Sequence, residues 1–127
     1  MFRQVGYFRR KRILREANFL DLKPIGKFEH KEGTNGGIVV LIPRFRGWLG
    51  KHLLQSRLKY PYITLELDAL GADTWLLSDG KNTVRQICQL LRQKHAEKIE
   101  PAEDRITTFL SGLYMQKLIT FTEILKP

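Results

Sequence analysis

Residues 62–80 read YITLELDALGADTWLLSDG and carry the strongest structural signals in the chain. Apolar and polar side chains alternate over residues 62–67, and this period of two predicts a half-buried strand. Asp68 follows at the position of a helix N-cap, because its carboxylate can accept hydrogen bonds from the free amides of a first turn. Asp79 and Gly80 then end the predicted helix, since glycine adopts the left-handed conformation that a helix exit often needs.

The length and composition limit the class of protein. The chain has 127 residues, of which 43% are hydrophobic, and this length predicts a single domain. The single cysteine, Cys88, excludes an intrachain disulfide framework and favours a reducing compartment. No apolar run is long enough for a transmembrane helix or the core of a signal peptide. We therefore expect a cytoplasmic protein.

The net charge of +9 is concentrated in two segments. Residues 1–15 hold six Lys/Arg and no acid, while the rest of the chain outside both segments holds eleven Lys/Arg against thirteen Asp/Glu. Such segments favour contact with nucleic acid, an anionic membrane surface or an acidic polypeptide, and a solvated charged segment is an equally good interpretation. The second segment, residues 44–59, holds five basic residues and no acid: Arg44, Arg46, Lys51, Arg57 and Lys59.

The N-terminal half of the chain predicts an arm, a hairpin and an insertion. Residues 1–24 form a basic arm without a clear apolar stripe, and we expect this arm to be poorly ordered. A hairpin is predicted over residues 25–43, with an alternating strand at 25–31, a glycine-rich turn at 33–37 and a β-branched strand at 38–42. The basic segment 44–59 is predicted as an insertion that contains one or two turns of amphipathic helix.

Two further helices and a last strand are predicted in the C-terminal half. The sequence Thr83-Val-Arg-Gln86 matches a capping box, in which the hydroxyl and the glutamine each satisfy a backbone amide. Cys88 falls on the apolar face of the helix that follows, so we interpret it as a core residue rather than a nucleophile. Pro101 suits the first position of the next helix, and residues 118–124 alternate as a last strand or an extended tail.

Strands followed by three helices and a short strand predict an α+β fold. We expect a three-stranded antiparallel sheet packed on a three-helix winged helix-turn-helix bundle. Residues 25–124 form this domain, with the basic insertion at 44–59, and residues 1–24 precede it as the arm.

Within this order of elements the residues resemble the PqqD-like family, named for pyrroloquinoline quinone (PQQ) synthesis protein D. Its members are also called recognition elements for ribosomally made, modified peptides. The resemblance extends over roughly residues 36–121, and Asp68 stands where the family often has Asn. It rests on three patterns: Leu67-Asp68-x-x-Gly71-x-x-x-Trp75, Asp79-Gly80-x-x-Thr83-Val84-x-x-Ile87, and Phe109-Leu110-x-x-Leu113 followed by Leu118-Ile119.

The resemblance implies a binding module rather than an enzyme. In the family, the leader segment of a precursor peptide adds as a strand to the exposed sheet edge beside the third helix. The peptide is then delivered to a modifying enzyme, often a radical S-adenosylmethionine protein. Carried over to this chain, the resemblance implies a peptide-binding edge made of Tyr62, Ile63, Thr64, Leu65 and Glu66, and a groove wall made of Thr107, Ser111 and Tyr114.

The arm and the insertion are additions to the family pattern. We hypothesise that their basic residues bind an acidic leader peptide, since opposite charges attract. The strand edge could also pair with a second copy of the chain, so a homodimer is an alternative. The family name does not by itself assign the chain to PQQ synthesis.

A winged-helix nucleic-acid-binding protein that uses the basic arm and loop is the main alternative function. Winged helices often place the third helix in the major groove, but here that helix begins with Glu103 and Asp104, which would repel phosphates. The three histidines, His30, His52 and His95, show no metal-ligand spacing, and no nucleophile motif is present. We therefore expect no enzymatic activity, no metal and no cofactor.

Overall fold

The computed structural model describes residues 3–43 and 62–126, and its fold is α+β, as predicted. The chain divides into two compact units. The sheet unit is Phe28–Ala72, and the helical unit combines Met1–Lys27 with Asp73–Pro127. No helix within the described ranges is both long and apolar enough to cross a membrane.

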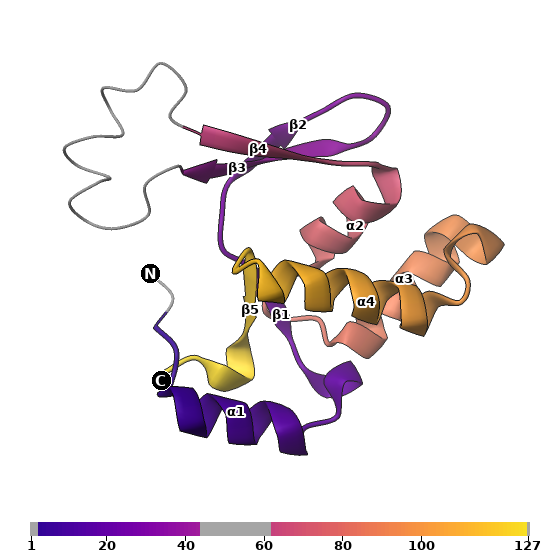
Figure 1. The fold of residues 1–127 in the computed structure, drawn as a ribbon. Helices are drawn as coiled ribbons and strands as arrows, with labels where there is room; N and C mark the ends of the chain where they lie inside the picture. Colours follow the sequence, from indigo (N-terminus) through magenta and orange to yellow (C-terminus); the bar gives the residue numbers. More distant parts are fainter. Residues whose placement is uncertain (1–2, 44–61, 127) are drawn as a thin grey trace. The chain divides into compact units, whose positions relative to one another are not determined.

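The sheet unit contains a three-stranded antiparallel sheet in the order β2–β3–β4. Its strands are β2 (His30–Glu32), β3 (Ile38–Pro43) and β4 (Tyr62–Leu67). Figure 1 labels the three strands. The turn between β2 and β3 is closed by Gly37 N, which donates to Thr34 O at 2.9 Å. A side chain on Gly37 would place its Cβ 2.3 Å from the Leu67 carbonyl oxygen, so the close approach of turn and strand requires glycine. The predicted turn at 33–37 and the predicted strands at 38–42 and 62–67 are thus confirmed.

One face of this sheet carries the buried residues of β3 and the residues of β4 that pair with them. The residues of β3 alternate between buried and partly buried, as expected for a strand with one covered face. Burial along β4 falls from its end toward its beginning: Leu67 is 9% exposed, whereas Ile63 is 50% exposed. The register places six apolar side chains on the same face, in the pairs Ile38–Leu67, Val40–Leu65 and Ile42–Ile63.

The helical unit is built from both ends of the chain. β1 (Pro24–Gly26) pairs antiparallel with β5 (Ile119–Phe121). Val5 N donates to Ile124 O at 2.8 Å, which joins the N-terminal segment to the C-terminal one. The helix α2 (Ala69–Leu77) begins in the sheet unit and continues into the helical unit. The other elements of the helical unit are α1 (Tyr7–Glu16), η1 (Phe19–Asp21), α3 (Val84–His95), η4 (Ala96–Ile99), α4 (Ala102–Met115) and η5 (Thr122–Ile124).

Predicted helix starts are confirmed at two positions. Asp68 Oδ1 accepts from Gly71 N at 2.8 Å ahead of α2. The capping box of α3 is complete, since Thr83 Oγ1 accepts from the amide of Gln86 at 3.1 Å and Gln86 Oε1 accepts from the amide of Thr83 at 2.8 Å. The face of α3 that was predicted to be buried is buried, and it consists of Val84, Ile87, Cys88 and Leu91.

Two predictions about the N-terminal half differ from the structure. Residues 25–31 were predicted as one strand, but the structure divides them between β1, which pairs with β5, and β2, which pairs with β3. The division follows from partners distant in sequence, because Gly26 N donates to Ser78 O and Lys27 N donates to Leu118 O. The arm, expected to be poorly ordered, contains α1 and buries Val5 and Leu22, which are 8% and 2% exposed.

The winged helix-turn-helix arrangement stays a prediction. The basic segment 44–59, with its expected amphipathic turns and its five basic residues, lies outside the described residues.

Candidate functional site

β4 lies at an edge of the three-stranded sheet. Within the described residues it pairs with β3 alone, so one side of its backbone is not used by the sheet. An edge strand presents a row of main-chain donors and acceptors that can pair with another extended chain. The predicted peptide-binding residues from Tyr62 to Glu66 all lie on this strand.

Two hydrogen bonds of the β2–β3 hairpin show the direction in which each main-chain group of β3 points. Gly33 N donates to Gly37 O at 3.0 Å, and Leu41 N donates to Glu29 O at 2.8 Å. Bonded and non-bonded pairs alternate along an antiparallel ladder. The odd-numbered residues of β3 therefore direct their main-chain groups toward β2, and the even-numbered residues direct theirs toward β4.

The same alternation identifies the free groups of β4. The register pairs the even-numbered residues of β3 with Leu67, Leu65 and Ile63, whose main-chain groups thus point toward β3. The N–H and C=O groups of the three intervening residues point away from β3. These outward-directed groups belong to Tyr62, Thr64 and Glu66, so the edge offers six main-chain partners at alternate positions.

The side chains of β4 divide between two faces. Tyr62, Thr64 and Glu66 lie on one face and are all exposed. Ile63 lies on the other face with Leu65, and half of Ile63 remains accessible. An edge strand with a half-exposed isoleucine leaves apolar surface that an added strand could cover.

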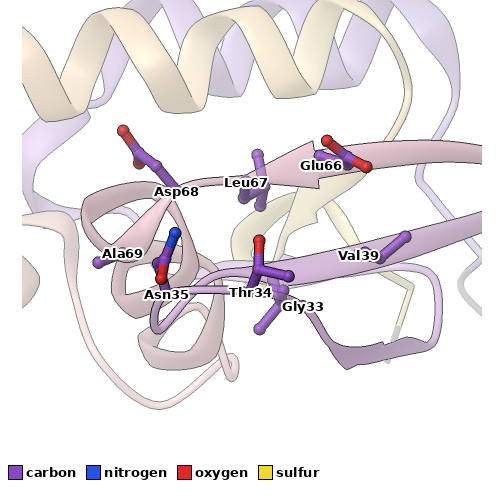
Figure 2. Close-up of a pocket in the computed structure, with 9 residues that line it drawn as sticks. Gly33, Thr34, Asn35, Val39, Glu66, Leu67, Asp68 and Ala69 are labelled. Carbon is purple, nitrogen blue, oxygen red and sulfur yellow. The ribbon is translucent and has the colours of Figure 1, made fainter.

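A hollow of about 420 Å³ lies at the end of β4, beside the β2–β3 turn. Figure 2 shows Thr34 and Asn35 on the turn side of this hollow, and Glu66 and Asp68 on the β4 side. Val39, the β3 neighbour of Glu66 in the register, also lines it. Glu66 forms no ion pair within the described part of the chain.

The sequence did not predict the turn residues Thr34 and Asn35 or Asp68 as part of a site. Their place in the hollow follows from the register of the sheet. An antiparallel register that pairs Ile38 with Leu67 necessarily brings the turn before β3 next to the residues that follow β4.

The three predicted groove-wall residues lie on α4, in the helical unit. They are spaced i, i+4 and i+7, which places them on one stripe of the helix. Ser111 is exposed, whereas Thr107 donates its hydroxyl to Glu103 O at 2.6 Å. The Tyr114 ring packs against Phe121, with 5.3 Å between centroids, so it has a structural role as well. The groove between α4 and β4 stays a prediction, as does partner binding by the five basic residues of the insertion.

Asp73, which lies outside the sheet edge, has two structural partners. His95 Nε2 lies 2.6 Å from Asp73 Oδ2, and Lys94 Nζ lies 3.0 Å from the same oxygen. Burial disfavours the charged form of Asp73, but the hydrogen bonds from His95 and Lys94 outweigh it and lower the pKa of this carboxyl group. Burial raises the pKa of the Cys88 thiol, which is unfavourable for a nucleophile. Among the described residues no His, Cys, Asp and Glu group has an arrangement that could hold a metal ion.

The comparison with protein families gives one match. Residues 62–119 match the model of Coenzyme PQQ synthesis protein D (PqqD). This segment is PqqD-like. The predicted resemblance is therefore confirmed, although the matched segment begins at β4 and is narrower than residues 36–121. No curated protein and no solved structure matches the chain. The matched family is named for its part in PQQ synthesis.

The residues that carry the PqqD-like pattern hold the scaffold together. Trp75 is 4% exposed, and its ring lies so close to Gly26 that a Cβ there would be 2.9 Å from Cζ2. Asp79 Oδ1 accepts from the amides of Lys81 and Asn82, at 2.8 and 3.1 Å. The pattern therefore identifies the framework, and the outward-directed groups of β4 are identified by geometry.

Proposed function

We propose that the chain is a non-catalytic module that captures the leader segment of a ribosomally made precursor peptide. The leader adds as a fourth strand to β4 and is presented to a modifying enzyme, with a radical S-adenosylmethionine protein as the expected class. The observation that carries this proposal is the row of outward-directed main-chain groups at Tyr62, Thr64 and Glu66. The PqqD-like match over residues 62–119 supports it.

Strand addition suits a protein that must bind a peptide without altering it. Main-chain hydrogen bonds contribute affinity with little demand on sequence, and side-chain contacts add selectivity. Each added main-chain bond contributes about 0.5–1.5 kcal/mol net. Six outward-directed groups on β4 therefore provide enough interaction for a specific but reversible complex.

Proline at position 64 tests the proposal directly. Thr64→Pro removes an outward N–H while leaving the bonds between β4 and β3 in place, because proline is tolerated on an edge strand when its nitrogen faces away from the sheet. Thr64→Val is the matched control, since it changes the side chain and keeps the amide. The probes are peptides selected from a displayed library of random nine-residue sequences against the wild-type protein and then labelled for fluorescence polarisation.

We expect Thr64→Pro to weaken binding of the selected peptides by about tenfold or more, because it removes a hydrogen bond and places a ring against the guest backbone. Thr64→Val should bind within about threefold of the wild type. Far-UV circular dichroism and thermal denaturation check that both variants are folded. Equal affinity of a folded Thr64→Pro variant and the wild type would rule out strand addition at β4.

A further inference from the structure

We propose that the bound strand carries a lysine or arginine opposite Glu66 and aliphatic residues on the opposite face, beside Leu65 and Ile63. This inference rests on the proposed function and specifies the class of peptide that β4 accepts. It follows from the register of the sheet, from the exposure of the β4 side chains and from the charge around the hollow at the end of β4.

The position of a guest residue determines the face on which its side chain lies. A guest residue directly opposite Glu66 has its side chain on the same face as Glu66, because paired residues in a sheet share a face. Its neighbours along the guest strand lie on the other face, with Leu65 and Ile63. An antiparallel guest is favoured, since this pairing is slightly more stable per residue and matches the rest of the sheet.

The row of side chains that ends at Glu66 leaves a negative charge at the sheet edge. Lys31 pairs with Val39, and Val39 pairs with Glu66, so the three residues form one row across the sheet. Lys31 is the cation of this row, and β3 lies between it and Glu66. Opposite charges stabilise directly opposed cross-strand pairs, and like charges destabilise them. A guest with Lys or Arg at this position completes the row.

The surroundings of Glu66 can accommodate the end of a long basic side chain. Asp68, Thr34 and Asn35 line the hollow beside it (Figure 2). Asp68 follows Glu66 by two residues, which is the diagonal position that long side chains reach across a strand pair. The Asp68 carboxylate already accepts from Gly71 N, so it is held in place as a second negative group.

The other face of β4 selects apolar side chains. Ile63 is 50% exposed and Leu65 is partly buried, and they share this face with Ile38, Val40 and Ile42 of β3. In an antiparallel guest, the residues one and three positions after the basic residue lie beside Leu65 and Ile63. The expected guest pattern is therefore a basic residue, an aliphatic residue, any residue and a second aliphatic residue.

A selection experiment with charge variants tests this pattern. The random nine-residue peptide library is selected in parallel on the wild type, Glu66→Gln, Glu66→Lys and Thr64→Pro, after each is shown to be folded by circular dichroism. The wild type should enrich the basic–aliphatic–any–aliphatic pattern. Glu66→Gln should lose the basic preference, and Glu66→Lys should replace it with Asp or Glu at the same position. One enriched peptide is then titrated beside its variant with Glu in place of the basic residue.

The titration should favour the basic peptide by about two- to fivefold on the wild type and the acidic peptide on Glu66→Lys. This inference would be overturned, and strand addition left intact, if the wild type and Glu66→Lys enriched the same motif while Thr64→Pro enriched none. Equal enrichment on Thr64→Pro and the wild type, or no enrichment on the wild type, would instead overturn the proposed function and this inference with it.

Discussion

Two glycines of the helical unit have opposite environments. Gly26 lies in β1, where an added Cβ would meet the Trp75 ring at 2.9 Å. Gly112 lies in α4, and nothing is within 4 Å of the corresponding position. The same substitution therefore has opposite consequences at the two positions, although both residues are glycines in regular secondary structure.

We expect Gly26→Ala to lower the free energy of unfolding by about 1–3 kcal/mol, because the buried Trp75 ring must shift to accept a methyl group. Gly112→Ala should raise it by about 0.5–1 kcal/mol, since alanine restricts the unfolded chain and favours the helix. Urea denaturation of both variants measures the two changes. If Gly26→Ala leaves the free energy of unfolding unchanged, the contact with Trp75 is not close-packed in solution.

Asp73 should contribute to the pH dependence of stability. Its pKa in the folded protein is lowered, because hydrogen bonds from His95 and Lys94 outweigh the opposing effect of burial. A carboxyl group with a depressed pKa stabilises the fold above its unfolded value of about 3.9, and this contribution is lost as the pH falls through the folded pKa.

At pH 7 we expect Asp73→Asn to be less stable than the wild type by about 1–2 kcal/mol. The difference should shrink as the pH falls below about 4, where the unfolded chain begins to bind a proton at this position, and it should vanish below the lowered pKa of the folded protein. Urea denaturation between pH 2.5 and 7 follows this difference, and Glu97→Gln, at an exposed position, serves as the control. A difference that stays constant over this range would contradict the linkage to Asp73.

At the scale of elements, α1 combines an anchored face with a basic one. Ile13 and Leu14 are partly buried, whereas Phe8 is 84% exposed. The solvent-facing stripe runs at i, i+3, i+4 and i+7, with Phe8 followed by Lys11, Arg12 and Arg15. The alternative function, contact with nucleic acid, depends on this stripe of three cations. The other candidate, α4, holds Glu103 in its first turn, and the hydrogen bond with Arg92 lowers the pKa of this carboxyl group, so it stays ionised.

Replacing Lys11, Arg12 and Arg15 by glutamine measures how much α1 contributes to contact with nucleic acid. We expect weak, sequence-independent binding of duplex DNA, whose salt dependence decreases in this variant. The slope of log K against log salt should fall by roughly 0.9 for each removed cation that contacts a phosphate. Filter binding at several salt concentrations gives the slope, with Lys98→Gln, another exposed cation, as the control. An unchanged slope would exclude α1 from DNA contact, and marked preference for one DNA sequence would favour the alternative function.

At the scale of the molecule, the two ends of the chain depend on each other. Gln4 forms a bridge with Leu125, and Lys126 N donates to Arg3 O at 2.8 Å. Thr120 is fully buried and donates its hydroxyl to Gln4 Oε1 at 2.6 Å. The N-terminal segment is therefore part of the helical unit rather than an independent tail.

We expect deletion of residues 1–24 to destabilise the protein strongly, because it removes buried Val5 and Leu22 and leaves the Thr120 hydroxyl without its acceptor. Differential scanning calorimetry should show a large fall in Tm for the deletion, whereas the triple glutamine variant of α1 should melt close to the wild type. This comparison separates the charge of the arm from its packing. A deletion variant that melts at the wild-type temperature would contradict the structural role of residues 1–24.

Local signals in the sequence were enough to predict β3, β4, the caps of α2 and α3, and the strand that carries the candidate site. These features depend on alternation, caps and turns within a few residues, so neighbouring side chains determine them. The division of residues 25–31 between two sheets, the ordered arm and the hollow beside Glu66 were decided by tertiary structure. Each depends on partners far away in sequence, such as Ser78 for Gly26 or Ile124 for Val5, and a single sequence carries no local signal for such pairings.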